Sequence, residues 1–286
     1  METIMQKTGL VLEGGAMRGL FTAGILDVML ENGLKTAGVI GVSAGAAFGC
    51  NFKSGQIGRA IRYNKRFCRE PRYCSWNSWL RTGDLFGADF CYHQLPEKLD
   101  PFDGDAYERN PMEFYLVCTD VLTGKAVYRN CPKADAECFE WMRASGSMPL
   151  VSRMVPIGGG RYLDGALADS IPLRFFESLG YERNIVILTQ PAGYRKNSSS
   201  ALGLLKLVYR KYPALIRTME NRHIHYNEEV DYAERQAEAG NVLLLRPETV
   251  LPVKRICHDP ELLQQTYDAG RDLAMKKLPE MRRFLS

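Results

Sequence analysis

The first fifty residues alternate between short apolar runs and glycine-rich turns, and this pattern limits the fold more than any other feature of the chain. Residues 8–13 (TGLVLE) and 37–42 (AGVIGV) each have the length and composition of a buried strand. They are followed by apolar-periodic, helix-forming sequence at 16–30 and 44–50. Because a strand-helix-strand-helix order is typical of a parallel sheet with crossover helices, an α/β fold is predicted.

Beyond residue 50 the pattern is less regular. Residues 51–110 mix aromatic side chains with Gly, Pro and Asp, which predicts short helices and long loops that cover a site. The other expected elements are strands at 113–120, 185–189 and 242–245, a hairpin return at 125–128, and helices at 135–144 and 260–284. The predicted architecture is a parallel-rich central sheet sandwiched by helices, with a C-terminal helical extension.

The composition argues against several functional classes. With 286 residues, 45% of them hydrophobic and 24% charged, the chain can build a large core as one domain, or as one domain plus an extension. No stretch approaches the ~20 apolar residues of a membrane-spanning helix, and residues 1–8 lack the apolar region of a secretory signal. The net charge of +4 is too small to indicate a nucleic-acid partner.

The eight cysteines are scattered, with no CxxC pair and no spacing to a histidine that would indicate zinc. Because no secretory signal is expected, the cysteines are predicted to be mostly buried, reduced thiols of a cytoplasmic protein. The sequence shows no other metal-binding pattern. Neither a metal nor a cofactor is predicted.

Ser43 lies at the second strand-to-helix turn, in the sequence Gly41-Val42-Ser43-Ala44-Gly45. Gly-x-Ser-x-Gly in this position is the signature of a nucleophile elbow, which holds the serine at a sharp, strained turn. Glycines two positions before and after the serine remove side chains that would collide with the crossing strand and helix. The first N–H groups of the following helix favour a developing negative charge at the same place. The alternative is a glycine-rich turn with an inert serine.

A second glycine cluster, EGGAMRG at residues 13–19, also joins a strand to a helix and exposes backbone N–H groups in an anion-binding turn. A dinucleotide fingerprint would need glycine where Ala16 stands and an acidic residue at the end of the second strand, which ends in serine instead. The cluster therefore favours an oxyanion hole that faces the serine. Arg18 adds a positive charge nearby, or it is a surface residue or a brace for the loop.

A catalytic serine needs a general base, and none of the four histidines lies in a small-residue context at a strand end. His258, late in the chain, could still complete a Ser-His-Asp triad. Asp164 is the better candidate, because glycines precede and follow it in GGGRYLDGA at residues 158–166. Its ordinary pKa near ~3.9 makes an aspartate a weak base, but burial would raise that pKa. Its alternative role is that of an ordinary Asp-Gly turn.

The blocks at residues 13–19, 41–45 and 164–166 resemble, in order and spacing, the three signature blocks of the patatin-like phospholipases. Three further segments are also similar to that family. They are a Thr-Asp…Thr-Gly hairpin at residues 119–124, ASGSMP at residues 144–149 and Ser-Ile-Pro at residues 170–172. The resemblance covers about residues 8–190. It implies a patatin-like acyl hydrolase domain over 8–190, and leaves 191–286 as a C-terminal extension that completes the sheet and adds helices.

The resemblance implies a Ser-Asp dyad without histidine, in which Ser43 attacks an ester carbonyl and Asp164 acts as its base. The implied oxyanion hole consists of the backbone N–H groups of Gly14, Gly15 and Ala16, with Arg18 bracing the loop. Two positions depart from the family pattern: Glu13 stands where Asp is frequent, and Ala16 where Gly is usual. Neither departure removes a catalytic group, because Ala16 keeps its N–H.

The function predicted is that of a serine acyl hydrolase acting on carboxylic esters of lipids, of the phospholipase A, lysophospholipase or esterase type. Two alternatives stay open: a lipid-binding or scaffolding protein with little turnover, and a Ser-His-Asp esterase that uses His258. The basic segment 195–225 could lie as an amphipathic helix on a membrane, although Pro213 interrupts it. The simpler interpretation is a helix packed on the domain with a solvated basic face. The predicted location is the cytoplasm, with peripheral membrane contact as an option.

Overall fold

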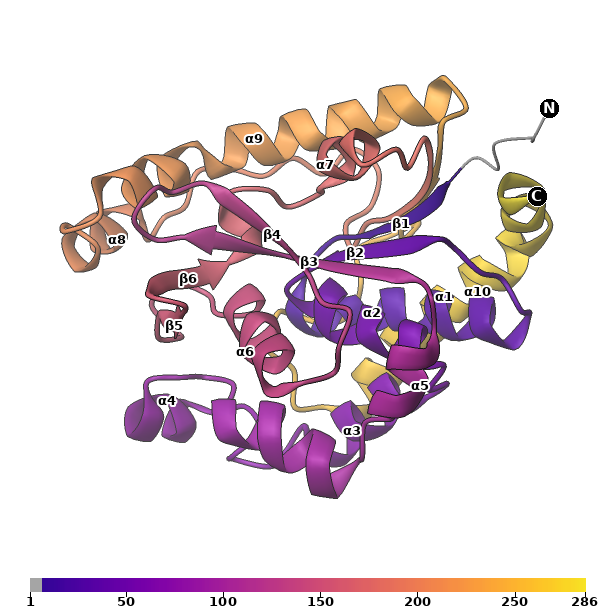
Figure 1. The fold of residues 1–286 in the computed structure, drawn as a ribbon. Coiled ribbons are helices and arrows are strands. Elements are labelled where there is room, and N and C mark those ends of the chain that lie inside the picture. The colour runs from indigo at the N-terminus through magenta and orange to yellow at the C-terminus, as the bar shows by residue number, and fades with distance from the viewer. Residues whose placement is uncertain (1–6) are drawn as a thin grey trace.

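A mixed sheet with helices on both faces forms the centre of the structure, a computed structural model that describes residues 7–286 (Figure 1). Within those residues the sheet has eight strands in the order β5-β6-β3-β2-β1-β7-β8, with β4 also paired to β3. The strands are β1 (Thr8–Leu12), β2 (Gly38–Val42), β3 (Glu113–Asp120), β4 (Ala126–Asn130), β5 (Val155–Ile157), β6 (Gly160–Asp164), β7 (Arg183–Ile187) and β8 (Val242–Leu245). The predicted parallel-rich α/β fold is confirmed. The expectation that no secretory signal is present falls almost entirely on residues outside the described part.

The parallel part of the sheet comprises β3, β2, β1, β7 and β8. β4 returns antiparallel to β3, as the turn sequence predicted. β5 and β6 were not predicted as strands, because the sequence around Gly158 and Gly159 has the composition of a loop. Both glycines adopt positive φ, 55° and 84°, at the tip of a β5-β6 hairpin whose second strand pairs antiparallel with β3. Asp164 is therefore the last residue of a strand.

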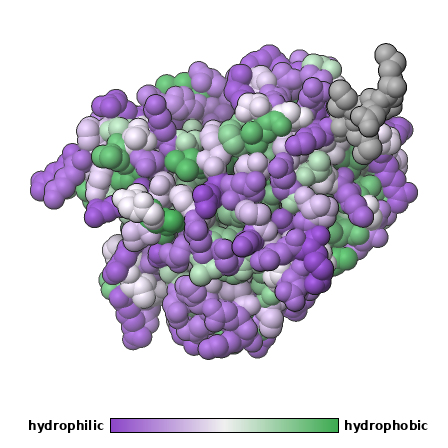
Figure 2. All heavy atoms as spheres, in the orientation of Figure 1, coloured by the Kyte–Doolittle hydropathy of each residue, from purple (hydrophilic) through white to green (hydrophobic). Residues whose placement is uncertain are grey.

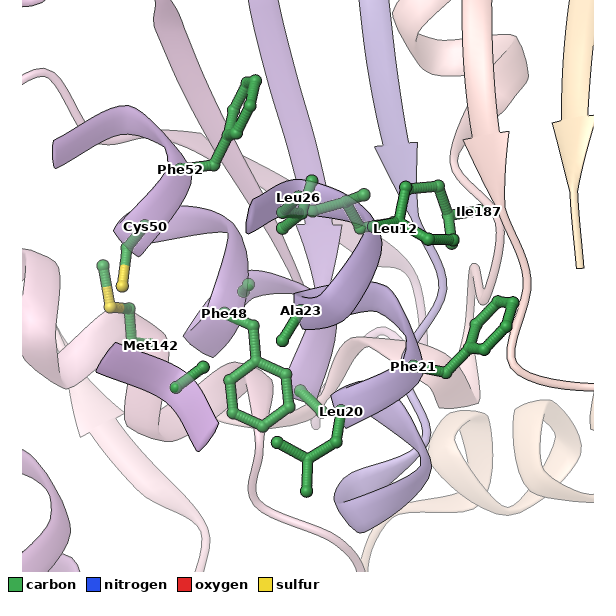
Figure 3. Packing of buried hydrophobic residues seen from close by; sticks show 14 of the residues in the cluster. Leu12, Leu20, Phe21, Ala23, Leu26, Phe48, Cys50, Phe52, Met142 and Ile187 are labelled. Carbon is green, nitrogen blue, oxygen red and sulfur yellow. The ribbon is translucent and has the colours of Figure 1, made fainter. Parts of the chain in front are cut away.

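One face of the sheet is covered by α1 (Gly19–Glu31), α2 (Ala44–Ser54) and α10 (Pro260–Leu285). α10 packs directly along α1, where a Cβ at Gly24 would lie 2.1 Å from the Tyr267 carbonyl oxygen. Figure 3 shows apolar side chains of β1, α1 and α2, among them Leu12, Leu20 and Phe48, in the core on this face. The C-terminal part of the chain thus packs against the N-terminal part.

The opposite face is covered by α7 (Leu173–Ser178) and α9 (Pro213–Glu238), which lie above the sheet in Figure 1. The segment 195–225 is not one helix: α8 (Leu202–Val208) ends before Pro213, and α9 begins at that proline and runs for 26 residues. Proline is well tolerated in the first turn of a helix, where its missing N–H would have no partner anyway. Pro213 therefore interrupts the basic segment, as expected, and also starts the longer helix.

The region 51–110 contains short helices joined by loops, as predicted. They are α3 (Arg59–Phe67), α4 (Trp76–Thr82), a π-helix at Phe90–Leu99 and α5 (Gly104–Arg109), and α6 (Ala136–Ser145) lies beside them. All eight cysteines are free thiols and seven of them are buried, in agreement with the sequence. Among residues 7–286, none of the helices has the length and apolar character that crossing a membrane requires.

Candidate active site

Ser43 lies between β2 and α2 with φ 55° and ψ −120°, a conformation that non-glycine residues rarely adopt. The turn is so tight that a Cβ at Gly41 would lie 2.5 Å from the Ala46 backbone nitrogen. A Cβ at Gly45 would lie 2.4 Å from the Leu12 carbonyl oxygen, on the neighbouring strand. The two glycines are required because any side chain at either position would collide with backbone. This geometry is that of a nucleophile elbow.

Ser145, at the end of α6, holds the elbow in place. Its hydroxyl accepts a hydrogen bond of 2.9 Å from the Ser43 backbone N–H and donates one of 2.7 Å to the Val117 carbonyl oxygen. The Ser145 side chain has no exposed surface, so water cannot replace these bonds. This role was missed from the sequence, because Ser145 stands 102 residues from Ser43 and nothing local connects the two.

Asp164 reaches the serine from the end of β6. Its backbone N–H donates to the Ser147 carbonyl oxygen at 2.8 Å, and its carbonyl oxygen accepts from the Thr119 hydroxyl at 2.8 Å. Its carboxylate accepts a hydrogen bond of 2.8 Å from the Ala166 N–H, and it lines the same pocket as Ser43. The structure therefore brings Ser43 and Asp164 together across three strands of the sheet.

Burial raises the pKa of the Asp164 carboxyl above its ordinary value. The Ala166 N–H, the positive charge of Arg222, the polar Ser43 side chain and the charge of Lys196 each oppose this rise. The net direction is upward, because desolvation is the largest of these effects. A higher pKa makes this aspartate a stronger base than an exposed one.

Gly14, Gly15 and Ala16 form the turn after β1, directly beside the serine. A Cβ at Gly14 would lie 2.9 Å from the Ser43 Cβ. Ala16 adopts a φ of 49°, in the left-handed region that favours the glycine usual at this position in the family pattern. Within the described residues the three N–H groups have no protein acceptor, whereas the flanking N–H groups of Glu13 and Met17 donate to carbonyl oxygens. Three unpaired donors thus lie next to the hydroxyl.

Arg18 takes a position different from that of a simple surface residue. Its backbone N–H donates to the Gly15 carbonyl oxygen at 3.2 Å, which closes the turn. Its side chain lines the polar side of the site, and its buried Nε has no hydrogen-bond partner among residues 7–286. The backbone of Arg18 braces the loop, while its guanidinium faces a pocket.

The structure does not bring a histidine to Ser43. The Nδ1 atom of His258 lies 2.5 Å from the Cys68 carbonyl oxygen, and His258 lines neither pocket that contains Ser43. The remaining three histidines are absent from both pockets as well. In the described part of the chain, no group of three or more His, Cys, Asp or Glu side chains is arranged to hold a metal ion.

Two pockets meet at Ser43, and they share Ala16 and Met148. The walls of the apolar pocket include Met17, Phe48, Tyr63, Tyr92, Phe102 and Met142. Phe48 and Met142 also belong to the core shown in Figure 3. The walls of the polar pocket include Glu13, Arg18, Lys196, Arg222, Tyr226 and Arg255. The hydroxyl therefore stands between an apolar and a cationic compartment.

Comparison with known proteins identifies the family. A sequence model described as patatin-like phospholipase matches residues 10–176, which is more than half of the chain. The chain belongs to the patatin-like phospholipase family. A second model, described as a domain of unknown function, matches residues 212–286. The division of the chain at residue 190 stays a prediction, since β8 completes the same sheet as β7 and α10 packs on α1.

Several relatives of this patatin-like chain are known. The protein YjjU of Escherichia coli is 29% identical over 65% of this chain and 53% of its own length. An NTE family protein of Mycobacterium bovis is 24% identical over 58% of this chain and 44% of its own length. Lysophospholipase nte1 of Emericella nidulans is 24% identical over 94% of this chain and 18% of its own length. The chain spans about half the length, or less, of the curated relatives it matches.

The structure of VipD from Legionella pneumophila is also similar to this patatin-like chain, with a TM-score of 0.47 and 12% identity. The similarity covers 96% of this chain and 67% of the VipD chain.

Proposed function

We propose that this chain hydrolyses carboxylic esters of lipids, with Ser43 as the nucleophile and Asp164 as its general base. The observation that carries the proposal is that one pocket brings together Ser43, the buried Asp164 carboxylate and the three unpaired amides. The family model and the lysophospholipase relatives support the same class of substrate. The apolar pocket supplies a place for an acyl chain.

In the proposed acylation step, the Ser43 oxygen attacks the ester carbonyl carbon while its proton passes to the Asp164 carboxylate. The carbonyl oxygen becomes an anion that accepts hydrogen bonds from the N–H groups of Gly14, Gly15 and Ala16. The intermediate then collapses, the bond to the alcohol breaks, and Asp164 returns the proton to the departing alkoxide oxygen. The acyl group stays on Ser43, with its chain in the apolar pocket.

In the proposed deacylation step, water attacks the acyl carbon and gives its proton to Asp164. The same amides bind the second oxyanion, and collapse of the intermediate releases the fatty acid as the Ser43 hydroxyl regains a proton from Asp164. One carboxylate thus serves as base and then acid in both halves of the reaction. No histidine takes part.

We expect the purified chain to release p-nitrophenol from acyl p-nitrophenyl esters and fatty acid from lysophospholipid, and His258→Ala to keep the wild-type rate. The His258 ring contacts the Cys68 carbonyl oxygen and lies outside both pockets, so its removal leaves the proposed chemistry intact. Steady-state kinetics with both substrates measures this. Loss of activity in His258→Ala with a normal melting temperature would favour the Ser-His-Asp alternative. Lipid binding without turnover of any ester would favour the lipid-binding alternative.

We also propose that the chain is cytoplasmic and contacts membranes peripherally through α8. Three apolar side chains of α8, Leu204, Leu207 and Val208, are more than half exposed, and basic residues follow them at the end of the helix. Figure 2 shows apolar residues next to hydrophilic ones at the left end of the molecule, where α8 lies in Figure 1. Such a mixture is typical of helices that rest on anionic lipid. The eight free thiols support a reducing compartment.

Hydrogen bonds of the Leu150 backbone connect the end of α8 with α4 near the candidate active site. The Leu150 backbone N–H donates to the Tyr209 hydroxyl at 3.1 Å, and its carbonyl oxygen accepts from the Trp79 ring at 3.0 Å. α4, which carries Trp79, also exposes Trp76 and Leu80. A membrane bound by α8 would therefore lie near the segment that carries Met148, which lines both pockets.

We expect the double variant Leu204→Ser/Leu207→Ser to lose about tenfold or more in binding to vesicles that contain anionic lipid, because two apolar side chains no longer insert. Hydrolysis of a soluble p-nitrophenyl ester should stay at the wild-type rate. Vesicle co-sedimentation measures the binding, and Ile224→Ser, which changes an exposed apolar residue of α9, serves as the matched control. Equal binding of the double variant and the wild type would contradict membrane contact through α8.

A further inference from the structure

We propose that Lys196, Arg222 and Arg255 form a phosphate subsite, which binds the anionic headgroup of the lipid whose ester Ser43 cleaves. This inference rests on the proposed function, because it assigns the alcohol side of the same substrate to the polar pocket. All three residues lie beyond residue 176, where the patatin-like model ends. The subsite therefore gives a role to the C-terminal part of the chain, most of which matches a domain of unknown function.

The charge of the polar pocket favours an anion. Four cations line it, Arg18 and the three residues of the phosphate subsite, against two carboxylates, Glu13 and Asp164. The Glu13 carboxylate is already occupied, because it accepts hydrogen bonds from the Tyr226 hydroxyl at 2.9 Å and from the Thr189 N–H at 2.6 Å. An excess of positive charge in a partly enclosed space attracts an anionic ligand.

The cations of the phosphate subsite also lack ion-pair partners. In the part of the chain that the structure describes, no acidic oxygen lies within 4.0 Å of their charged nitrogens. Neighbouring cations outside the pocket are paired: Arg195 with Asp231 at 2.6 Å, and Lys206 with Glu220 at 2.6 Å. Lys196 and Arg222 are half-buried, whereas Arg255 is exposed. Since half-buried cations are normally paired, the unpaired Lys196 and Arg222 point to a ligand.

Lys196 is held in position by its backbone rather than by a charge. Its N–H donates to the Asn227 side-chain oxygen at 2.9 Å, and its carbonyl oxygen accepts from the Asn227 amide nitrogen at 3.1 Å. Its Nζ lies 3.7 Å from the centroid of the Tyr226 ring. The ammonium is thus fixed over an aromatic face of the polar pocket while its N–H donors stay available to a ligand.

Arg222 and Arg18 show the same pattern of a fixed side chain with unused donors. Arg222 Nε donates to the Ala166 carbonyl oxygen at 2.7 Å, which fixes the guanidinium beside the Asp164 turn. The buried Arg18 Nε has no partner within residues 7–286. A buried donor without an acceptor is costly unless a ligand supplies the acceptor. A phosphate, with several acceptor oxygens, matches converging guanidinium and ammonium groups.

The position of the phosphate subsite fits a glycerolipid. The apolar and polar pockets meet at Ser43, so an ester bond held there would direct its acyl chain into one pocket and its alcohol into the other. In a lysophospholipid the phosphate is attached to the same short alcohol as the ester. We therefore expect preference for anionic phosphate headgroups over neutral monoacylglycerol, and over headgroups that carry a choline cation.

The test compares kcat/KM for lysophosphatidylglycerol and for monoacylglycerol with the same acyl chain. We expect the wild type to prefer the anionic ester by about 10- to 100-fold, the range of a charge-assisted contact. Lys196→Gln and Arg255→Gln should each lower this ratio by about tenfold, whereas Lys196→Arg should retain it. A variant that only weakens the Ser43-Asp164 dyad lowers kcat/KM for both esters and leaves their ratio unchanged. Arg195→Gln is the control, because Arg195 forms an ion pair with Asp231 outside the pocket.

Inorganic phosphate distinguishes a headgroup site from a site for free anions. We expect phosphate to inhibit hydrolysis of the anionic ester competitively, and calorimetry to show phosphate binding that weakens in Lys196→Gln. An equal kcat/KM for the two esters overturns the headgroup assignment, even if phosphate binds. Ser43-dependent hydrolysis of both esters without any preference would leave the proposed function intact. Phosphate binding by calorimetry tests the subsite even if no ester is cleaved.

The preference should also depend on pH. Burial, together with the positive charges of Arg222 and Arg255, lowers the pKa of Lys196 to about 7, although the charges of Glu13 and Glu229 oppose this shift. A depressed pKa means that Lys196 loses its charge as pH rises through about 7. The preference for lysophosphatidylglycerol, whose phosphodiester stays singly charged, should therefore fall between about pH 6 and about pH 8. A constant ratio across this range would contradict a role of the Lys196 charge.

Discussion

Ser43→Ala is expected to lower kcat for p-nitrophenyl ester and lysophospholipid hydrolysis by about 10⁴-fold or more, to the background left by the amides and the pockets alone. The reason is that the variant removes the atom that forms the bond to the acyl group. Alanine and serine are similarly disfavoured at the positive φ of 55° that residue 43 adopts. The stability of the folded chain should therefore change little. Single-turnover kinetics with a melting curve measures both properties.

The matched control is Ser199→Ala, which replaces an exposed serine away from both pockets. It should retain the wild-type rate with both substrates. Activity of Ser43→Ala close to that of the wild type would mean that another group attacks the ester, and the proposed mechanism would have to be abandoned.

Asp164→Asn is expected to lower kcat by about 10²- to 10⁴-fold, the contribution of a positioned general base. The asparagine keeps an oxygen that can accept the Ala166 N–H but cannot take the serine proton. In the wild type the rate should fall as pH drops through the raised pKa of Asp164, because the base must be ionised. Above that pKa, Asp164 is already ionised, so the rate should no longer change with its titration. A rate that is the same in wild type and variant would exclude Asp164 as the base.

The same substitution should stabilise the protein near neutral pH. Because the pKa of Asp164 is higher in the folded chain than in the unfolded chain, its contribution to stability is fully present below the unfolded pKa and is lost as pH rises through the folded pKa. At neutral pH the buried carboxylate therefore opposes folding, and a neutral asparagine removes that effect. Melting temperatures measured from about pH 4 upward should show a growing advantage of the variant. If Asp164→Asn were less stable than the wild type at every pH, the predicted direction of the stability change would be wrong.

The sequence predicts well those parts of the fold that depend on local pattern. β1, β2, α1 and α2 follow from apolar runs and from glycines that neighbouring backbone requires, such as Gly45 against the Leu12 carbonyl oxygen. The β5-β6 hairpin was missed, since its strands are short and its turn is made of glycines. α9 was recognised only in part, because Pro213 was taken as a break and not as a helix start.

The residues of the candidate site also fall into those that a local motif indicates and those that it does not. Ser43 and Asp164 could be proposed from the sequence because each stands in a short motif with a mechanical reason for its glycines. Ser145 and the cations of the phosphate subsite were not found, because tertiary packing alone brings them to the site. In the sequence Lys196 is one of many basic residues between 195 and 225. In the structure its place in the polar pocket and its missing ion pair distinguish it from Lys206. Contacts between distant segments leave no local pattern in a single sequence.

The most direct test of the central claim is covalent labelling by a fluorophosphonate, with the modified residue identified by peptide mass spectrometry and the labelling rate compared among variants. If a carboxylate activates the serine without a histidine, the adduct forms on Ser43 at the same rate in the wild type and in His258→Ala. In Asp164→Asn the labelling should slow by about 100-fold or more. An adduct on another residue, or labelling of Ser43 that Asp164→Asn leaves unchanged, would contradict the account.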